Sequence, residues 1–339
     1  MTDAPGLFQR FRLRQKRRRL LWRSFRSRRD LTPVADRTAA IRPRDVLVVM
    51  VLRNEAHRLP YMLDHYRRLG VAHFLAVDND STDDTAAILG AAPDVSLWRT
   101  GASYRAARFG LDWASWLLMH HGHEHWCLMV DADELLVFAN CDSRTLPDLT
   151  AWLDARGQVA FGALMLDLYP KGPVGEADVA PGTDPVLALP WFDAGPYRSV
   201  RQAPAMNLWV QGGPRERIFF GDAPRRSPTL NKVPLVRWNR RWAFTNSCHA
   251  LLPWKLNMVW SSPGGPEPAG VLLHSKFLAD VVVRATEDLA RRQHFHDPDL
   301  LVPYYRALAA RPVLWTPDSV RYTGWQTLVD HGLMPAIAW

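Results

Sequence analysis

Continuous apolar runs alternate with helically spaced apolar residues in the first half of the chain. Between Asp45 and Arg53 lies the run VLVVMVL, and such an unbroken aliphatic segment is typical of a parallel strand buried on both faces. The predicted strands are 45–53, 73–78, 95–99 and 126–130, and the predicted helices are 59–69, 82–89 and 104–120. This alternation predicts an α/β fold with a mostly parallel, Rossmann-like sheet and helices on both faces.

Residues that start or stop helices support two of these predictions. Pro60 suits the first turn of the helix 59–69, and Gly70 stands where a C-terminal cap belongs. The run from Ser81 to Asp84 resembles a capping box that would open the helix 82–89.

Proline and glycine interrupt the pattern beyond residue 140, above all between 170 and 230. Short strands are predicted near 233–238 and 271–274, and a helix is predicted over 280–292. The second half of the fold is therefore expected to be less regular than the first.

The net charge of +8 comes from the N-terminal arm. Residues 1–30 carry 11 Lys or Arg against two Asp, which gives +9, and the remaining residues sum to −1. Because the chain beyond the arm has almost no net charge, a general nucleic-acid-binding domain, which would be basic, is not expected there. Residues 10–29 interleave arginine with Phe11, Trp22 and Phe25, a composition that suits either a disordered solvated arm or an anionic membrane surface.

Targeting signals and cysteine usage indicate a cytoplasmic protein, with peripheral attachment to the inner face of a membrane left open. The apolar core of the arm is only three residues long, too short for a secretory signal, and no run approaches a transmembrane helix. Three cysteines without CxxC spacing fit a reducing compartment.

Polar clusters follow three of the predicted strands directly. They are Arg53-Asn54-Glu55, Asp78-Asn79-Asp80 and Asp131-Ala132-Asp133-Glu134. Because ligands of parallel sheets bind outside the carboxyl ends of the strands, all three are expected at one rim. Two carboxylates two positions apart share a face of an extended segment, and such oxygen ligands suit Mg²⁺ or Mn²⁺. An alternative is that the acidic pair is an ordinary solvated turn.

Taken together, these segments resemble glycosyltransferase family 2, which has the GT-A fold, and in particular its bacterial branch with RNE, DNDSTD and DADE motifs. The later segments GGPRERIF, SCHALLP and LLHSKF extend the resemblance over residues 45–310. It implies a basic arm (1–40), a GT-A domain (41–310) and a C-terminal tail (311–339). Within the domain, 41–137 would be the nucleotide-binding half and 138–310 the acceptor-side half.

The resemblance implies a nucleotide-diphosphate-sugar donor, most simply a UDP-sugar, together with Mn²⁺ or Mg²⁺. In place of the usual Asp-Asp-Gly-Ser, this chain has Asp78-Asn79-Asp80-Ser81. The implied nucleotide-binding residues are Arg53, Asn54, Glu55, Asp78, Asn79, Asp80, Arg108, Asp131 and Lys276, with Arg105 as a further cation for the diphosphate. The implied metal ligands are Asp131 and Asp133, with a late histidine, first His274 and second His249.

An inverting transfer also needs a carboxylate that takes the proton of the acceptor hydroxyl. Glu216, in Gly212-Gly-Pro-Arg-Glu-Arg217, is the first candidate, and Glu134 and Asp167 are the alternatives. A Glu between two arginines is also typical of a salt-bridged structural residue.

The hypothesis that best unites these features is an inverting, metal-dependent hexosyltransferase. Its acceptor would be a glycan or glycolipid in surface polysaccharide synthesis, and its arm would lie at an anionic membrane surface. One alternative is a nucleotidyltransferase that uses the same carboxylates, although no glycine-rich phosphate loop follows the first strand. Another is a non-catalytic membrane- or nucleic-acid-binding protein built on a degenerate α/β body, which the intact Asp131 and Asp133 argue against.

Overall fold

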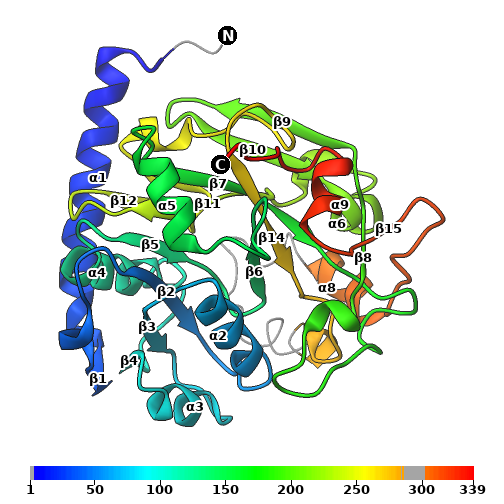
Figure 1. Ribbon diagram of the computed structural model, residues 1–339, viewed down its shortest axis with the longest axis horizontal. Coiled ribbons are helices and arrows are strands. Elements are labelled where there is room, and N and C mark those ends of the chain that lie inside the picture. Colours follow the sequence, from blue (N-terminus) through cyan, green and yellow to red (C-terminus); the bar gives the residue numbers. More distant parts are fainter. Residues whose placement is uncertain (1–3, 284, 286–301) are drawn as a thin grey trace.

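A nine-stranded sheet forms the centre of the computed structural model, which describes residues 4–283, 285 and 302–339. Its strand order is β1-β4-β3-β2-β5-β11-β7-β14-β6 (Figure 1). The strands are β1 (Thr32–Ala35), β2 (Val46–Leu52), β3 (His73–Asp78), β4 (Val95–Arg99), β5 (Trp126–Met129), β6 (Glu134–Val137), β7 (Ala160–Asp167), β11 (Asn231–Arg237) and β14 (Ala269–His274).

Six of these strands run in one direction, and this confirms the predicted fold class. β2, β3, β4 and β5 are mutually parallel, and β11 pairs antiparallel with both β5 and β7. β7 is thereby parallel to β5, and β14 is parallel to β7. β1, β11 and β6 are the antiparallel members. The carboxyl ends of six strands consequently meet at one edge, where the polar clusters were expected.

Helices cover both faces of the sheet because alternate residues of the buried strands point to opposite sides. Val48 and Met50 of β2 pack with α2, α3 and α5, whereas Leu47 and Val49 pack with α4 on the other face. The helices are α2 (Leu59–Arg68), α3 (Thr85–Ala91), α4 (Leu111–His121) and α5 (Leu146–Asp154).

The second half of the chain builds a separate core around β7 and β14. Its smaller elements are α6 (Gly213–Phe219), α8 (Val302–Ala309), α9 (Trp325–Asp330), β8 (Trp191–Phe192), β9 (Tyr197–Gln202), β10 (Asn207–Gly212), β12 (Ala243–Asn246), β13 (Ala250–Leu252) and β15 (Val320–Arg321). β9 pairs with β10, β12 with β13 and β8 with β15. The segment 311–339 packs on the body, where Ile337 joins the main core and Trp152 Nε1 donates to Ala338 O at 2.9 Å.

Two predicted helices begin later than the sequence indicated. Helix 104–120 starts only at Leu111, because Arg108, Phe109 and Gly110 all adopt positive φ. A Cβ on Gly110 would lie 2.7 Å from Val51 Cγ1, so the chain turns tightly against the sheet here.

The capping box predicted at Ser81 is absent, and α3 begins at Thr85. The side chains of this segment bind another backbone instead. Ser81 Oγ accepts from Asn54 N at 3.0 Å, and Thr85 Oγ1 accepts from Glu55 N at 2.8 Å. These bonds to the loop after β2 compete with helix capping.

The N-terminal arm is helical. Residues Leu7–Ser27 form α1, which lies along one edge of the molecule against α4 (Figure 1). The disordered alternative therefore does not describe these residues. Of the helix predicted over 280–292, residues 281–283 and 285 are helical, and residues 284 and 286–292 lie outside the described part of the chain.

Candidate active site

The turn from Asp131 to Glu134 joins β5 to β6 at the carboxyl edge of the sheet. Glu134 N donates to Asp131 O at 3.1 Å within the turn. Neighbouring elements hold it from both sides, since Ser275 N donates to Asp133 O at 2.8 Å and Tyr66 Oη donates to Glu134 O at 2.8 Å. The turn is therefore fixed through Asp133 to the residue after β14 and through Glu134 to α2.

Strand register places His274 between two carboxylates at this turn. His274 of β14 lies opposite Glu134 of β6 on one side and Asp167 of β7 on the other. Its Nδ1 lies 2.6 Å from Asp167 Oδ1, and its Nε2 lies 3.1 Å from Asp133 Oδ2. The result is a continuous line of contacts from Asp167 through His274 to Asp133.

Electrostatics keep this line charged. Burial lowers the pKa of His274, but Asp133 and Asp167 outweigh that effect and raise it to about 9. Burial favours neutral carboxyls, yet His274, Arg58 and Lys276 hold the pKa of Asp133 well below its usual range. Burial likewise opposes the charge on Asp167, and Arg215 with His274 brings that pKa to about 2. Two anions thus flank one imidazolium when no cation is bound.

The donor chemistry of this line fits a divalent cation. A histidine that binds a metal through one ring nitrogen normally donates the N–H of the other to a carboxylate. Asp167 is such a carboxylate, because it accepts a hydrogen bond from His274 Nδ1. Without its proton, His274 Nε2 would offer a nitrogen 3.1 Å from Asp133 Oδ2, and these two atoms would hold a divalent ion that stabilises charge on a bound phosphate. Within residues 4–283, 285 and 302–339, no group of three His, Cys, Asp or Glu side chains is already gathered as a metal site.

The other two predicted ligands lie differently. The Asp131 side chain is 58% exposed and lies 3.3 Å from Lys232 Nζ. His249 is half-buried, and its Nδ1 donates to Asn231 O at 2.5 Å. Burial, with Lys232 nearby, lowers the pKa of His249 to about 4. The structure thus brings His274 together with Asp133 and places His249 beside Lys232.

Lys232 is a site residue that the sequence analysis missed. Its ammonium, on β11, lies 2.6 Å from Glu134 Oε1, and both side chains are buried. Burial disfavours the charge, but Cys248, Glu134 and Asp131 raise the pKa of Lys232 well above its ordinary value. The signal available in the sequence was a single lysine in the otherwise apolar segment Lys232-Val-Pro-Leu-Val236.

Arg215 is a second missed residue, although it lies in the GGPRERIF segment. Its Nε donates to Asp167 Oδ2 at 2.6 Å in a buried pair. Its Nη2 is buried and has no hydrogen-bond partner among the described residues. A buried guanidinium N–H without a partner is energetically costly.

Lys276 and Arg58 add positive charge around Asp133. Lys276 Nζ lies 5.7 Å from the ring centroid of Tyr304. Arg58, which the sequence analysis also missed, forms a bidentate pair with Asp280 at 2.5 and 2.6 Å and lies 3.6 Å from Glu55. The start of α2 is thereby joined to the segment after β14.

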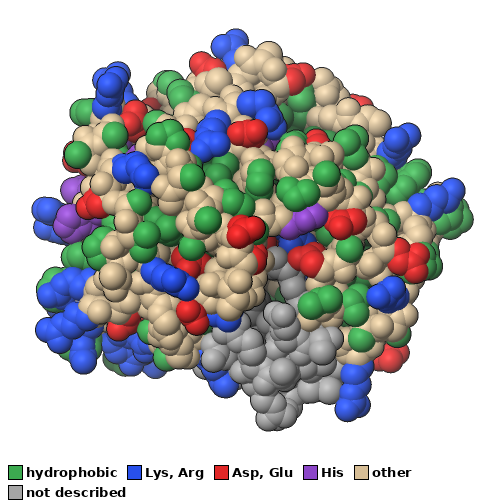
Figure 2. Space-filling model, turned by 90° about the horizontal axis from the view of Figure 1, so that it is seen from below, with side chains coloured by type: hydrophobic (Ala, Val, Ile, Leu, Met, Phe, Trp, Pro, Cys, Tyr) green, Lys and Arg blue, Asp and Glu red, His purple; other side chains and the backbone are tan. Residues whose placement is uncertain are grey.

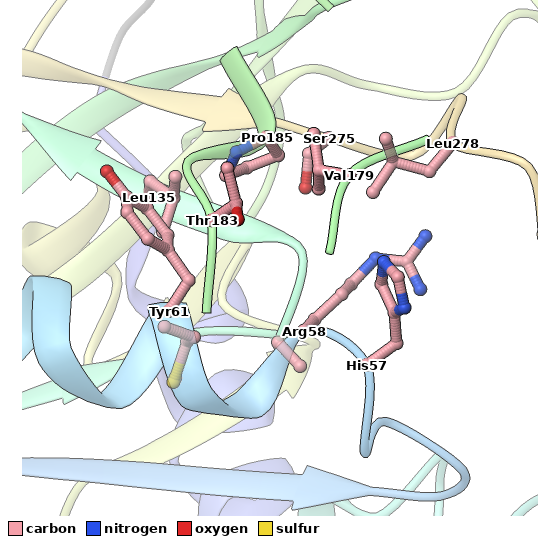
Figure 3. A pocket seen from close by; sticks show the side chains of 11 residues that line it. His57, Arg58, Tyr61, Leu135, Val179, Thr183, Pro185, Ser275 and Leu278 are labelled. Carbon is pink, nitrogen blue, oxygen red and sulfur yellow. The ribbon is translucent and has the colours of Figure 1, made fainter. Parts of the chain in front are cut away.

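A pocket lies beside this cluster, between the start of α2 and the segment 275–278 (Figure 3). Arg58 and Tyr61 line it from α2, and Ser275, Thr183 and Pro185 line it from the opposite side. Ala132 also contributes, so the pocket opens next to the Asp131–Glu134 turn.

The predicted nucleotide-binding residues after β2 and β3 are held by neighbouring residues of the same edge. Asn54 has a left-handed backbone (φ 53°), and its Oδ1 accepts from Thr82 N at 2.8 Å. Asp78 is buried and lies 3.3 Å from Arg99 Nε. Asn79 Nδ2 donates to Thr100 O at 3.0 Å. These side chains shape the edge of the sheet.

Arg53 and Asp80 reach further out at the same edge. Arg53 Nη1 donates to Asn79 O at 2.9 Å and lies 3.7 Å from Asp80, whose side chain is 59% exposed. Arg108 is turned elsewhere, because its Nε donates to Asp112 Oδ1 at 2.7 Å and its Nη1 donates to Phe244 O at 3.1 Å.

The carboxylates considered as bases are all ion-paired. Glu216 of α6 accepts two bonds of 2.7 Å from Arg198 and one of 2.8 Å from Ser227 Oγ. Its side chain keeps 12% exposure, whereas those of Glu134 and Asp167 keep 1% and 0%. Glu216 is the candidate that retains contact with solvent.

Comparisons with known proteins give only distant similarities. No family model and no curated protein matches the chain. A mannosyltransferase, PcManGT from Pyrobaculum calidifontis, in complex with GDP-Man and Mn²⁺, superposes with a TM-score of 0.28 and 22% identity. The match covers 46% of each chain, so this chain spans under half of that protein.

Two nucleotide-handling enzymes superpose similarly. The 4-diphosphocytidyl-2C-methyl-D-erythritol synthase gives a TM-score of 0.25 with 16% identity, over 41% of this chain and 66% of that one. The UTP-bound UGPase from Acinetobacter baumannii gives 0.27 with 8% identity, over 55% and 85%. Superpositions this weak do not assign a function.

Proposed function

We propose that the protein transfers a glycosyl group from a nucleotide-diphosphate sugar to a hydroxyl acceptor, with a divalent cation held by Asp133 and His274. The observation that carries the proposal is the Asp167–His274–Asp133 line at the carboxyl edge of the parallel strands. Asp131, exposed in the same turn, would face the ribose or a water molecule on the ion.

A bound Mn²⁺ or Mg²⁺ would supply Lewis-acid stabilisation of the diphosphate leaving group. The protein's own cations would add to it. Lys276 lies near Asp133, and the partnerless Nη2 of Arg215 offers a hydrogen bond to a phosphoryl oxygen. Donors placed where negative charge develops stabilise the transition state more than the ground state.

Arg53 and Asp80 would meet the nucleoside, because they reach out of the edge that Asn54, Asp78 and Asn79 shape. For the acceptor we propose Glu216 as the base. Its solvent contact distinguishes it from Glu134 and Asp167, and proton transfer requires that it exchange a bond from Arg198 or Ser227 for one from the acceptor. The narrower assignment, to surface glycan or glycolipid synthesis, rests on the sequence resemblance.

Thermal unfolding with a panel of UDP, GDP, CMP and dTDP, each with and without Mn²⁺, tests the donor class. A ligand that binds only the folded state raises the melting temperature, so one nucleoside diphosphate should do so in a Mn²⁺-dependent way. Asp133→Asn should remove the Mn²⁺-dependent part, and Asp142→Asn, which changes an exposed carboxylate after β6, should not. The absence of any nucleotide effect with Mn²⁺ would refute the proposal.

The identity of the released product separates glycosyl transfer from nucleotidyl transfer. With the nucleotide sugar that stabilises the protein best, glycosyl transfer releases a nucleoside diphosphate. Nucleotidyl transfer breaks the α–β phosphate bond of the same nucleotide sugar and releases a sugar phosphate. Detection of a sugar phosphate without any nucleoside diphosphate would assign the site to the alternative reaction.

A further inference from the structure

We propose that α1 is an interfacial helix that docks the protein on an anionic lipid bilayer. The inference is independent of the reaction at the carboxyl edge. It rests on α1 having two apolar faces, of which the body covers only one.

The inner face fixes the helix to the body. Leu13 and Leu20 are buried against Ala243 and Leu252 of the β12–β13 hairpin. Arg23 binds Asp112 of α4 at 3.0 Å, and that carboxylate also pairs with Arg108. The helix therefore has a defined orientation, which determines the residues on its other side.

The outer face carries large apolar side chains in solvent. Phe11 is 48% exposed and Trp22 is 57% exposed. Leu7 and Phe8, at the N-terminal end, are 84% and 72% exposed, and Phe25, near the other end, is 44% exposed. Leu7, Phe11, Trp22 and Phe25 lie four, eleven and three residues apart, so they share one face opposite Leu13 and Leu20. Arg18 lies on the same face, and Phe25 also contacts Trp116 of α4 edge-on.

Positive charge surrounds this face. Nine of the 21 residues of α1 are Lys or Arg and none is acidic. Arg26 lies 4.8 Å from the Trp22 ring and Arg14 lies 5.8 Å from the Phe11 ring. In Figure 2, Lys and Arg side chains gather at the left edge, the side that α1 occupies in Figure 1.

This combination fits a bilayer surface better than a nucleic acid. Arginines alone would bind phosphates of either kind. The exposed Leu, Phe and Trp side chains near both ends of the helix are stabilised by leaving water, which the hydrocarbon of a bilayer permits. A helix of 21 residues is roughly 32 Å long and would lie in the plane of the headgroups. None of the described helices is long and apolar enough to cross a membrane.

Co-sedimentation with vesicles tests the proposal on the full chain. The protein should bind vesicles of phosphatidylcholine with 30% phosphatidylglycerol and should bind pure phosphatidylcholine far more weakly. Phe11→Ser/Trp22→Ser should weaken the binding more than tenfold, since both rings leave solvent on docking. Leu187→Ser/Val200→Ser is the matched control, because those apolar side chains lie outside α1 and are more exposed than Phe11 and Trp22.

The contribution of charge is tested separately with Arg18→Gln/Arg19→Gln. We expect vesicle affinity to fall about fivefold for each charge removed, and the binding of the unmodified protein to weaken steeply as salt is added. These side chains point to solvent, so the melting temperature should not change. Deletion of the arm is a poorer test, since it would uncover the apolar contacts of Leu13 and Leu20.

Two outcomes would overturn the inference. One is vesicle binding that the Phe11→Ser/Trp22→Ser variant retains in full. The other is tighter binding to duplex DNA than to anionic vesicles at physiological salt, unaffected by that variant, which would make α1 a nucleic-acid-binding surface.

Discussion

Lys232 Nζ and Glu134 Oε1 lie 2.6 Å apart in the interior, directly beneath the turn that carries Asp131 and Asp133. The two residues come from strands on different sides of β7 and β14 in the sheet order, so their pairing ties together distant parts of the fold. Burial and this contact favour a positioning role for Glu134 over that of a base.

Loss of one partner of this pair should be costly. We expect Lys232→Met to lower the free energy of unfolding by about 3 to 5 kcal/mol, because it leaves the Glu134 carboxylate buried without its cation. Urea unfolding followed by circular dichroism measures the change.

The double variant Lys232→Met/Glu134→Gln is the control. It removes both charges, so it should recover a large part of the lost stability. Equal destabilisation in the single and double variants would show that the pair is not the source of the effect.

Asp167 should control metal affinity through His274. Asp167→Asn removes the negative acceptor of the His274 ring, and we expect Mn²⁺ affinity to fall about 10- to 100-fold. Titration of Mn²⁺ followed by electron paramagnetic resonance reports binding without turnover. Asp142→Asn is the control, and unchanged affinity in Asp167→Asn would exclude His274 as a ligand oriented by Asp167.

Glu216→Gln should separate catalysis from binding. If Glu216 is the base, release of nucleoside diphosphate from the donor should slow about 100-fold or more while nucleotide affinity stays the same. Ser227→Ala, which removes a neighbour of Glu216 without removing the carboxylate, should retain most of the rate. If the rate of nucleoside diphosphate release falls in both variants in proportion to their loss of thermal stability, Glu216 has a structural role.

His65 should make stability fall in mild acid. Burial lowers its pKa to about 4, and its ring Nε2 donates to Leu136 O at 3.1 Å. Between about pH 6.5 and 4 the unfolded chain binds a proton at His65 that the folded chain does not. As the pH falls through this range, the free energy of unfolding therefore decreases by up to about 1.4 kcal/mol for each pH unit.

The comparison variant is His65→Gln, which keeps a donor for Leu136 O but does not titrate. Unfolding free energies of both proteins at pH 7, 6 and 5 give a difference that should shrink as the pH falls. A difference that does not vary with pH would show that His65 is not responsible.

The first half of the sheet was predictable because its signals are local. The run VLVVMVL became β2, and the predicted strands 73–78 and 95–99 became β3 and β4 with the same bounds. Pro60 and Gly70 mark α2 as expected, and Gly70 has a positive φ. An aliphatic run that must be buried on both faces has few other conformations available.

Contacts between distant segments account for the differences. Helix α3 begins later than predicted because Ser81 and Thr85 bind the loop after β2. Helix α4 is shorter than predicted because the chain turns at Gly110. Neither contact can be read from spacing along the chain, because each depends on which strand lies alongside.

The sequence by itself determined the α/β class and the polar residues that follow the strands, since continuous apolar runs and the residues that follow them are local properties. It also singled out Asp131, Asp133 and His274 as candidate ligands, a prediction that the experiments above test. Tertiary structure alone decided which side chains meet. Pairing of β14 with β7 and β6 placed His274 between Asp167 and Asp133, and β11 delivered Lys232 to Glu134. Packing of Leu13 and Leu20 on the body likewise decided which face of α1 remains exposed. Helical spacing shows which residues share a face, but only the contact with β12 and β13 determines which face is buried.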